Sequence, residues 1–193
     1  DALRIHDIQG EGHYSPYKDT TVSDIEGIVT YVDGNEFYMQ DLQPDENDKT
    51  SEGILVYKSS HGVEVGEVVK VSGTVKEYFL DGYDDRYDTD LPVTEISAST
   101  VNVTGTQALP EPIIIGENRP KEVIDNDAFA EFDPLEDAID YWESIEGMLV
   151  QVGDIKAVAP QEHGDLITVL ENEPTNSLHG GLLYEDGKPN PHR

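Results

Sequence analysis

Apolar and polar residues alternate along two neighbouring stretches of the chain, residues 24–32 and 36–41. Side chains of a β-strand point alternately to opposite faces, so this period of two predicts two strands. One face of the first strand is expected to carry Ile25, Gly27, Val29 and Tyr31. A turn at residues 33–35 joins the two strands, and a third strand is predicted at 53–58 after an acidic loop. The pattern is typical of a strongly curved antiparallel meander at the start of a small β-barrel.

Two further alternating stretches, residues 67–79 and 93–103, bring the predicted strands to five. Within the first of them Val69, Val71 and Val75 share a face with Gly73, and a glycine there lets a strand coil sharply. Five strands are the number that an OB-fold barrel requires. We therefore expect a mainly β protein, with a five-stranded OB-fold barrel in residues 1–110 and a smaller α+β or β extension in residues 111–193.

The predicted extension begins with an edge strand at residues 113–115 and a helix at residues 133–145. Asp133 is the expected N-cap of that helix, with Pro134 at the first helical position. One apolar stripe of the helix is expected to be buried: Leu135, Ile139, Trp142 and Ile145. Further strands are predicted at residues 146–152, 155–158 and 166–170. At the other end of the chain Leu3, Ile5 and Ile8 suggest a short initial strand.

Charge changes this picture most, because 41 acidic residues against 12 basic ones give a formal net charge of −29. The acidic residues are spread evenly, which excludes a single acidic tail or patch. A field of this sign repels phosphate backbones and anionic membranes, whereas nucleic-acid binding usually depends on Lys and Arg. Two interpretations remain open: a solvated acidic surface suited to high salt, or sites for divalent cations such as calcium, which prefers carboxylate oxygens.

Other compositional features exclude several kinds of site. The chain contains no cysteine, so it has no disulfide, no thiolate metal site and no thiol nucleophile. No apolar run approaches the roughly 18 residues of a membrane span, and no leader segment is recognisable at Asp1. The sequence also lacks a Ser-His-Asp set, an HExxH helix and a phosphate-binding glycine loop. We therefore expect no catalytic residue in this chain.

Two groups of residues are candidate metal ligands. The segment 81–90 carries five aspartates, of which Asp84, Asp88 and Asp90 could hold calcium if the loop folds back. Its spacing departs from the EF-hand pattern, and a solvated acidic loop is the alternative. His6 and His13 flank a glycine-rich turn, but no third ligand with convincing spacing accompanies them.

Several ordered blocks resemble one family, the secreted endonucleases of the ExeM/NucH type. The blocks are IHDIQGEGHYSP at 5–16, VSDIEGIVT at 22–30, FYMQD at 37–41, TSEGILVY at 50–57 and EGMLV at 146–150. The ending, with GGLL at 180–183 and PNP at 189–191, is also similar. In this family the region is an OB-fold accessory module, and a separate endonuclease/exonuclease/phosphatase domain follows it. The resemblance implies an extracellular or cell-surface protein whose parent is a metal-dependent endonuclease.

The resemblance and the predicted barrel together favour a non-catalytic module that positions nucleic acid for a downstream phosphodiesterase domain, with which it would be in intramolecular contact. OB-folds bind strands across the face of their second and third strands, where aromatic side chains stack on bases. The candidate binding residues are Tyr31, Phe37, Tyr38, Tyr57, Lys58, Lys70 and Lys76. Because alternating aromatics on a barrel are partly core, no more than two of the four should be exposed. The alternative is a structural or docking module, stabilised by calcium or needing no cofactor, that binds no nucleic acid.

Overall fold

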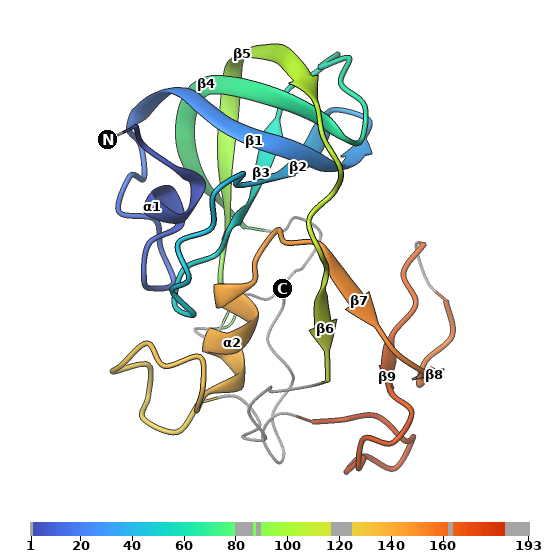
Figure 1. Ribbon diagram of the computed structural model, residues 1–193. Helices are drawn as coiled ribbons and strands as arrows, with labels where there is room; N and C mark the ends of the chain where they lie inside the picture. The colour runs from blue at the N-terminus through green and yellow to red at the C-terminus, as the bar shows by residue number, and fades with distance from the viewer. Residues whose placement is uncertain (1, 80–86, 88–89, 117–124, 162–163, 184–193) are drawn as a thin grey trace.

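The computed structural model describes residues 2–79, 87, 90–116, 125–161 and 164–183 (Figure 1). A barrel of long strands forms one part of the molecule, and a helix with two small sheets lies on one side of it. The elements in chain order are α1 (Ile5–Gln9), β1 (Thr21–Asp33), β2 (Glu36–Gln40), β3 (Gly53–Tyr57), β4 (Glu67–Tyr78), β5 (Val93–Thr106), β6 (Ile113–Ile115), α2 (Ala138–Ser144), β7 (Val150–Val152), β8 (Ile155–Ala157) and β9 (Thr168–Leu170).

The five long strands close into a barrel in the order β1-β2-β3-β5-β4. β1 pairs antiparallel with both β2 and β4, β2 pairs antiparallel with β3, and β3 pairs parallel with β5. All five predicted strands are present, with ends that differ from the prediction by three residues at most. The OB-like, mainly β fold expected from the sequence is therefore confirmed.

A bulge in β1 changes which side chains face outward. The register with β2 shifts between Val29 and Tyr31, so Thr30 is an extra residue in the strand. Val29 stays in the core, whereas Tyr31 is 53% exposed on the outside. The expectation that Tyr31 shares a face with Val29 is therefore wrong, because one inserted residue reverses the alternation after it. Val32 consequently turns inward and packs against the core.

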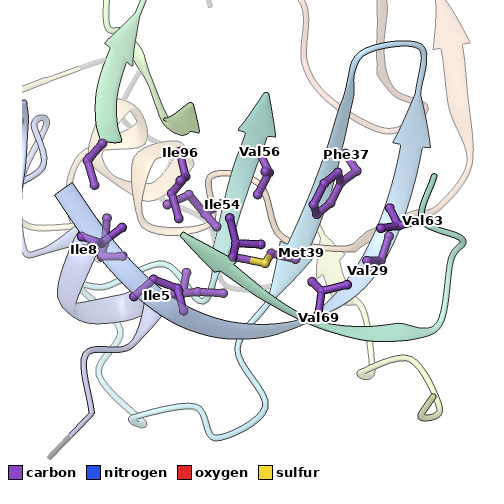
Figure 2. Packing of buried hydrophobic residues seen from close by; sticks show 14 residues of the cluster. Ile5, Ile8, Val29, Phe37, Met39, Ile54, Val56, Val63, Val69 and Ile96 are labelled. Atoms are coloured by element: carbon purple, nitrogen blue, oxygen red, sulfur yellow. The ribbon is translucent and has the colours of Figure 1, made fainter. Parts of the chain in front are cut away.

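The barrel core is a single cluster of buried apolar side chains from all five strands and α1 (Figure 2). Val69, Val71 and Val75 of β4 lie in it, as their alternation predicts. Gly73 interrupts the series at a bulge, where a Cβ atom would come within 2.3 Å of a backbone oxygen of β5. The absence of a side chain thus allows β4 and β5 to approach each other closely.

The predicted initial strand is wrong, because residues 5–9 form the short helix α1. The carboxylate of Asp7 accepts a hydrogen bond from the backbone N–H of Arg4, which satisfies a donor at the helix start. Ile5 and Ile8, three residues apart, fall on one helical face, and both are completely buried in the barrel core (Figure 2). The same apolar residues that suggested a strand therefore anchor a helix against the barrel.

The extension contains the predicted edge strand and a shorter helix than expected. β6 pairs parallel with β7, and β8 pairs antiparallel with β9. α2 begins at Ala138, so Asp133 is not its N-cap; Asp137 occupies that position. The backbone oxygen of Asp133 instead accepts the N–H groups of residues 136 and 137 in a preceding turn. Leu135 lies in that turn and is 73% exposed, so the predicted apolar stripe is wrong at its first position.

The rest of the predicted stripe of α2 faces the protein. Ile139 is buried, and Trp142 and Ile145 are half-buried. Trp142 lines a hollow together with Val150 and Val152 of β7 and Ile155 of β8. No helix in the described part of the chain is long and apolar enough to cross a membrane. The domain boundary at residue 110 stays a prediction.

Glu146 joins the barrel to the extension. Its Oε1 accepts hydrogen bonds from the backbone N–H of Thr94 at 2.9 Å and from Nε2 of Gln9 at 3.3 Å. Its backbone oxygen accepts a 2.6 Å hydrogen bond from the hydroxyl of Ser51. The neighbouring Gly147 contacts Gly53 so closely that a Cβ on Gly53 would lie 2.3 Å from the carbonyl carbon of Gly147. We call these contacts the Glu146 clasp.

We predict that Gly53→Ala destabilises the protein by about 3 kcal/mol or more, because the added methyl group meets backbone atoms that cannot rotate away. Urea denaturation followed by circular dichroism measures this change. Gly105→Ala is the matched control, since a Cβ on Gly105 meets nothing within 4 Å, and its effect should stay within about 0.5 kcal/mol. Equal unfolding midpoints for the two variants would contradict this account of the clasp.

Candidate functional site

Three tyrosines lie on the outer face of β1, β2 and β3. Tyr31 pairs with Tyr38 across the β1–β2 ladder, and their ring centroids are 6.3 Å apart with planes tilted by 52°. Tyr57, at the end of β3, is 46% exposed, and Tyr38 is half-buried between its neighbours. We call Tyr31, Tyr38 and Tyr57 the tyrosine face. It presents two accessible aromatic rings on the side of the barrel where OB-folds bind strands.

Phe37 does not belong to the tyrosine face. It is 0% exposed and lies in the barrel core (Figure 2). The centroid of its ring is 5.3 Å from that of His61. Phe37 and Tyr38 are consecutive in one strand, so their side chains necessarily point to opposite sides of the sheet. Of the four aromatic candidates, two are exposed, one is half-buried and one is core.

The three candidate lysines do not form a basic patch. Lys58 donates a 2.7 Å hydrogen bond to the backbone oxygen of Ser99. Lys76 forms an ion pair of 2.7 Å with Asp19, which lowers the pKa of that aspartate, and Lys70 lies 3.9 Å from a carboxylate oxygen of Glu26. Carboxylates thus neutralise two of the three ammonium groups, and only Lys58, next to Tyr57 in the sequence, borders the tyrosine face.

Carboxylates also surround the tyrosine face. Glu36 pairs with Tyr57, and Glu95 pairs with Leu55 in the next strand. Burial, and secondarily the charge of Glu36, raises the pKa of Glu95. Burial together with the nearby charges of Glu36 and Glu146 raises the pKa of Tyr38. The local field is therefore negative, and an anionic ligand would meet repulsion here unless salt screens it.

A second polar group lies at the N-terminal end of the chain. The Arg4 guanidinium forms a two-pronged ion pair with Asp41, whose carboxylate also accepts the backbone N–H groups of Ile5 at 3.0 Å and Gln43 at 2.8 Å. His6 Nδ1 lies 3.1 Å from Glu52 Oε2. His6, Asp41 and Glu52 are close enough to hold a metal ion, but Arg4 already neutralises Asp41. We interpret this network as the structural attachment of α1 to β2 and β3.

Both histidines that the sequence suggested as ligands are thus paired with separate carboxylates. His13 Nε2 is in hydrogen-bond contact with Oδ1 of Asp140 in α2, and its ring lies edge-on to those of Phe129 and Phe132. His6 and His13 therefore do not converge on one metal. Sequence spacing does not reveal either partner, because Glu52 and Asp140 lie 46 and 127 residues away along the chain.

Of the three candidate calcium ligands in the 81–90 loop, only Asp90 is among the described residues. Asp84 and Asp88 lie outside the described residues. Asp90 is buried, and its Oδ2 accepts a 2.8 Å hydrogen bond from the backbone N–H of Tyr87. The calcium assignment to this loop stays a prediction.

Another aspartate cluster was missed in the sequence. Asp137 belongs to two groups, one with Asp125 and Asp127 and the other with Asp133 and Asp140, and within each group the carboxylate oxygens lie within 4.8 Å of one another. Burial, and secondarily the charge of Asp133, raises the pKa of Asp137 to about 7. The signal was the repetition of aspartate over 125–140, of which only Asp133 was given a role from the sequence, as a helix N-cap. We call these five residues the Asp137 cluster.

Comparisons with known proteins give matches to a family model and to solved structures. A family model described as a domain of unknown function (DUF8508) matches residues 102–193, which include the whole Asp137 cluster. None of the curated proteins matches the chain. Among solved structures, an aspartyl-tRNA synthetase from Entamoeba histolytica is similar with a TM-score of 0.34 and 18% identity, over 64% of this chain and 25% of that one. The chain thus spans about a quarter of the synthetase, and its function has to be argued from its own surfaces.

We predict that the contribution of His6 to stability depends on pH. Burial lowers the pKa of His6, but the hydrogen bond and charge of Glu52 outweigh burial, so the folded-state pKa is raised. A raised pKa means that the folded protein holds the proton more tightly than the unfolded chain, which titrates near ~6.5. The stabilisation is therefore fully present below that pH and is lost as the pH rises through the folded-state pKa.

The measurement is the difference in unfolding free energy between the natural protein and His6→Asn from pH 5.5 to 8.5. The difference should be largest at the acidic end and shrink towards the alkaline end. His179→Asn, at an exposed histidine, serves as control, and a trend shared by both variants would not come from the contact of His6 with Glu52. A difference for His6→Asn that grows with pH would contradict the assigned ion pair with Glu52.

Proposed function

We propose that this chain is a non-catalytic OB-like module whose tyrosine face binds single-stranded nucleic acid and positions it for a metal-dependent phosphodiesterase domain. The observation that carries the proposal is the exposure of Tyr31 and Tyr57, two large aromatic side chains on the outside of β1 and β3. Exposed aromatic rings serve as platforms for bases in other OB-folds, and each stacked base contributes about 1–3 kcal/mol. The phosphodiesterase setting and the extracellular location rest on the resemblance of the sequence blocks to secreted endonucleases.

Stacking, not phosphate contact, has to supply the affinity. Lys70 and Lys76 are paired with carboxylates, and Glu36 and Glu95 lie beside the tyrosines. A protein that neutralises phosphates loses affinity as salt rises, because counterions are no longer released favourably. Here salt instead screens the repulsion between the acidic face and the strand. The proposed binding is therefore weak at low ionic strength and strengthens with added salt.

This salt dependence gives the test. We predict that a labelled single-stranded oligonucleotide binds more tightly at about 1 M than at about 0.05 M sodium chloride, the reverse of ordinary DNA-binding proteins. Fluorescence anisotropy measures the affinity at each concentration. Tyr31→Ala and Tyr57→Ala should each weaken binding roughly 5- to 150-fold, the loss of one stacked base.

Tyr14→Ala is the matched control for these substitutions, because Tyr14 is equally exposed but lies outside the tyrosine face, near Lys18. It should leave the affinity unchanged. Equal losses in all three variants would indicate a general effect on the fold. No binding at any salt concentration would refute the nucleic-acid role of this chain.

A docking module is the second candidate function. Val150 and Val152 of β7 and Ile155 of β8 are exposed apolar residues that line one hollow with Trp142. An apolar surface of this kind fits contact with a following domain of the same parent protein. This candidate predicts no retention of nucleic acid in any salt, so the titration above distinguishes the two functions.

A further inference from the structure

Among the described residues, two buried oxygens of the Asp137 cluster accept no hydrogen bond from an N–H group. Asp137 is 0% exposed, yet among the described residues its Oδ2 has no hydrogen-bond donor. The same holds for Oδ1 of Asp133, which belongs to the same ligand group. A buried carboxylate oxygen without a donor destabilises the protein, because it has lost its hydrogen bonds to water and has formed no other hydrogen bond in their place.

The remaining oxygens of the cluster are held in place by the backbone. Asp137 Oδ1 accepts the N–H of Asn126 at 3.0 Å, and Asp140 Oδ2 accepts the N–H of Asp133 at 2.9 Å. Asp125 and Asp127 accept N–H groups of residues 129–131. These bonds fix the carboxylates of Asp125, Asp127, Asp137 and Asp140. Oxygens of Asp133, Asp137 and Asp140 lie within 4.8 Å of one another.

Positive charge at the cluster is scarce. Among the described residues, His13 contacts Asp140, and no lysine or arginine forms an ion pair with any of the five aspartates. Several carboxylates packed together without a cation repel one another strongly in a medium of low dielectric constant. The protein as a whole carries a formal charge of −29, which further favours capture of a cation.

We propose that the Asp137 cluster is a calcium-binding site centred on Asp133, Asp137 and Asp140, with Asp125 and Asp127 grouped beside Asp137. Calcium takes six to eight oxygen ligands in flexible geometry, which a set of carboxylates from a loop and a helix start can provide. Magnesium requires a nearly ideal octahedron and retains several waters, so it fits this crowded set of carboxylates less well. The bound ion ties the segment 125–140 together and, through the pair of Asp140 with His13, holds it against the N-terminal loop.

The rival explanation is a proton shared by Asp133 and Asp137. The raised pKa of Asp137, about 7, describes the cluster without a cation and fits either explanation. The two explanations differ in their response to calcium: a shared proton predicts none, whereas the proposed site predicts tight binding accompanied by stabilisation. Calcium at this site is independent of nucleic-acid binding by the tyrosine face, because the two involve different residues.

Isothermal titration calorimetry of the chelator-treated protein with calcium chloride tests the proposal. We expect binding of one ion, at least about tenfold tighter than that of magnesium, and a higher melting temperature with calcium than with chelator. Absence of calcium binding would overturn the proposal, and so would equal affinities for the two ions.

Asp137→Asn is the decisive variant, because it keeps the shape of the side chain and removes one charge. In chelator it should be at least as stable as the natural protein, since the repulsion is relieved, but its calcium affinity should fall at least about tenfold. Asp133→Asn should behave in the same way. Asp48→Asn, at an exposed aspartate of another acidic loop, removes the same charge and should keep the full calcium response.

A double variant, Asp84→Asn with Asp88→Asn, tests the 81–90 loop separately. It should retain both the calorimetric signal and the thermal shift. If the double variant loses the calcium response while Asp137→Asn keeps it, calcium binds the 81–90 loop and the Asp137 cluster is not the site.

Discussion

The hydrogen bonds of the buried residue Glu146 hold the barrel and the extension together. Glu146 accepts hydrogen bonds from Gln9 at the end of α1 and from Thr94 in β5, and its own backbone accepts from Ser51 before β3. Three segments far apart in the sequence thus meet on one residue of the extension. A buried charge of this kind is costly unless its bonds are satisfied, so the clasp forms only when all three segments are in place.

The same principle governs the other buried acids. In a chain of this charge each buried carboxylate needs donors, and most of them come from the backbone or from the few cations available. Asp41 has Arg4 and two N–H groups, and Glu52 has His6 and the N–H of Asp45. The Asp137 cluster departs from this rule, since two of its oxygens have no donor in the described structure. That departure is why a cation is proposed there and not at the Arg4 network.

The barrel was predictable because apolar residues alternate with polar ones over long stretches of its strands. Every second side chain of such a strand faces the core, so the alternation in the sequence reflects burial directly. The direction of the Tyr31 side chain was not predictable, because a single bulged residue reverses which face each later side chain points to. The bulge is not recognisable in the local alternation of apolar and polar residues. α1 has only five residues, too few to display a helical period. The candidate site was predictable in part: two of the four candidate aromatics are exposed, within the expected number, but the partners of the lysines and of Glu146 are set by tertiary contacts.

The contact between Gly53 and Gly147 has a consequence for the order in which the protein can mature during synthesis. Strands β1 to β5 are complete once the ribosome has passed Thr106, so the barrel can close while the extension is still being made. The backbone at Gly53 and the side chain of Gln9 acquire their partners only some forty residues later, when residues 146–149 emerge. A barrel that forms during synthesis therefore lacks the contacts of the Glu146 clasp until residues 146–148 have left the ribosome.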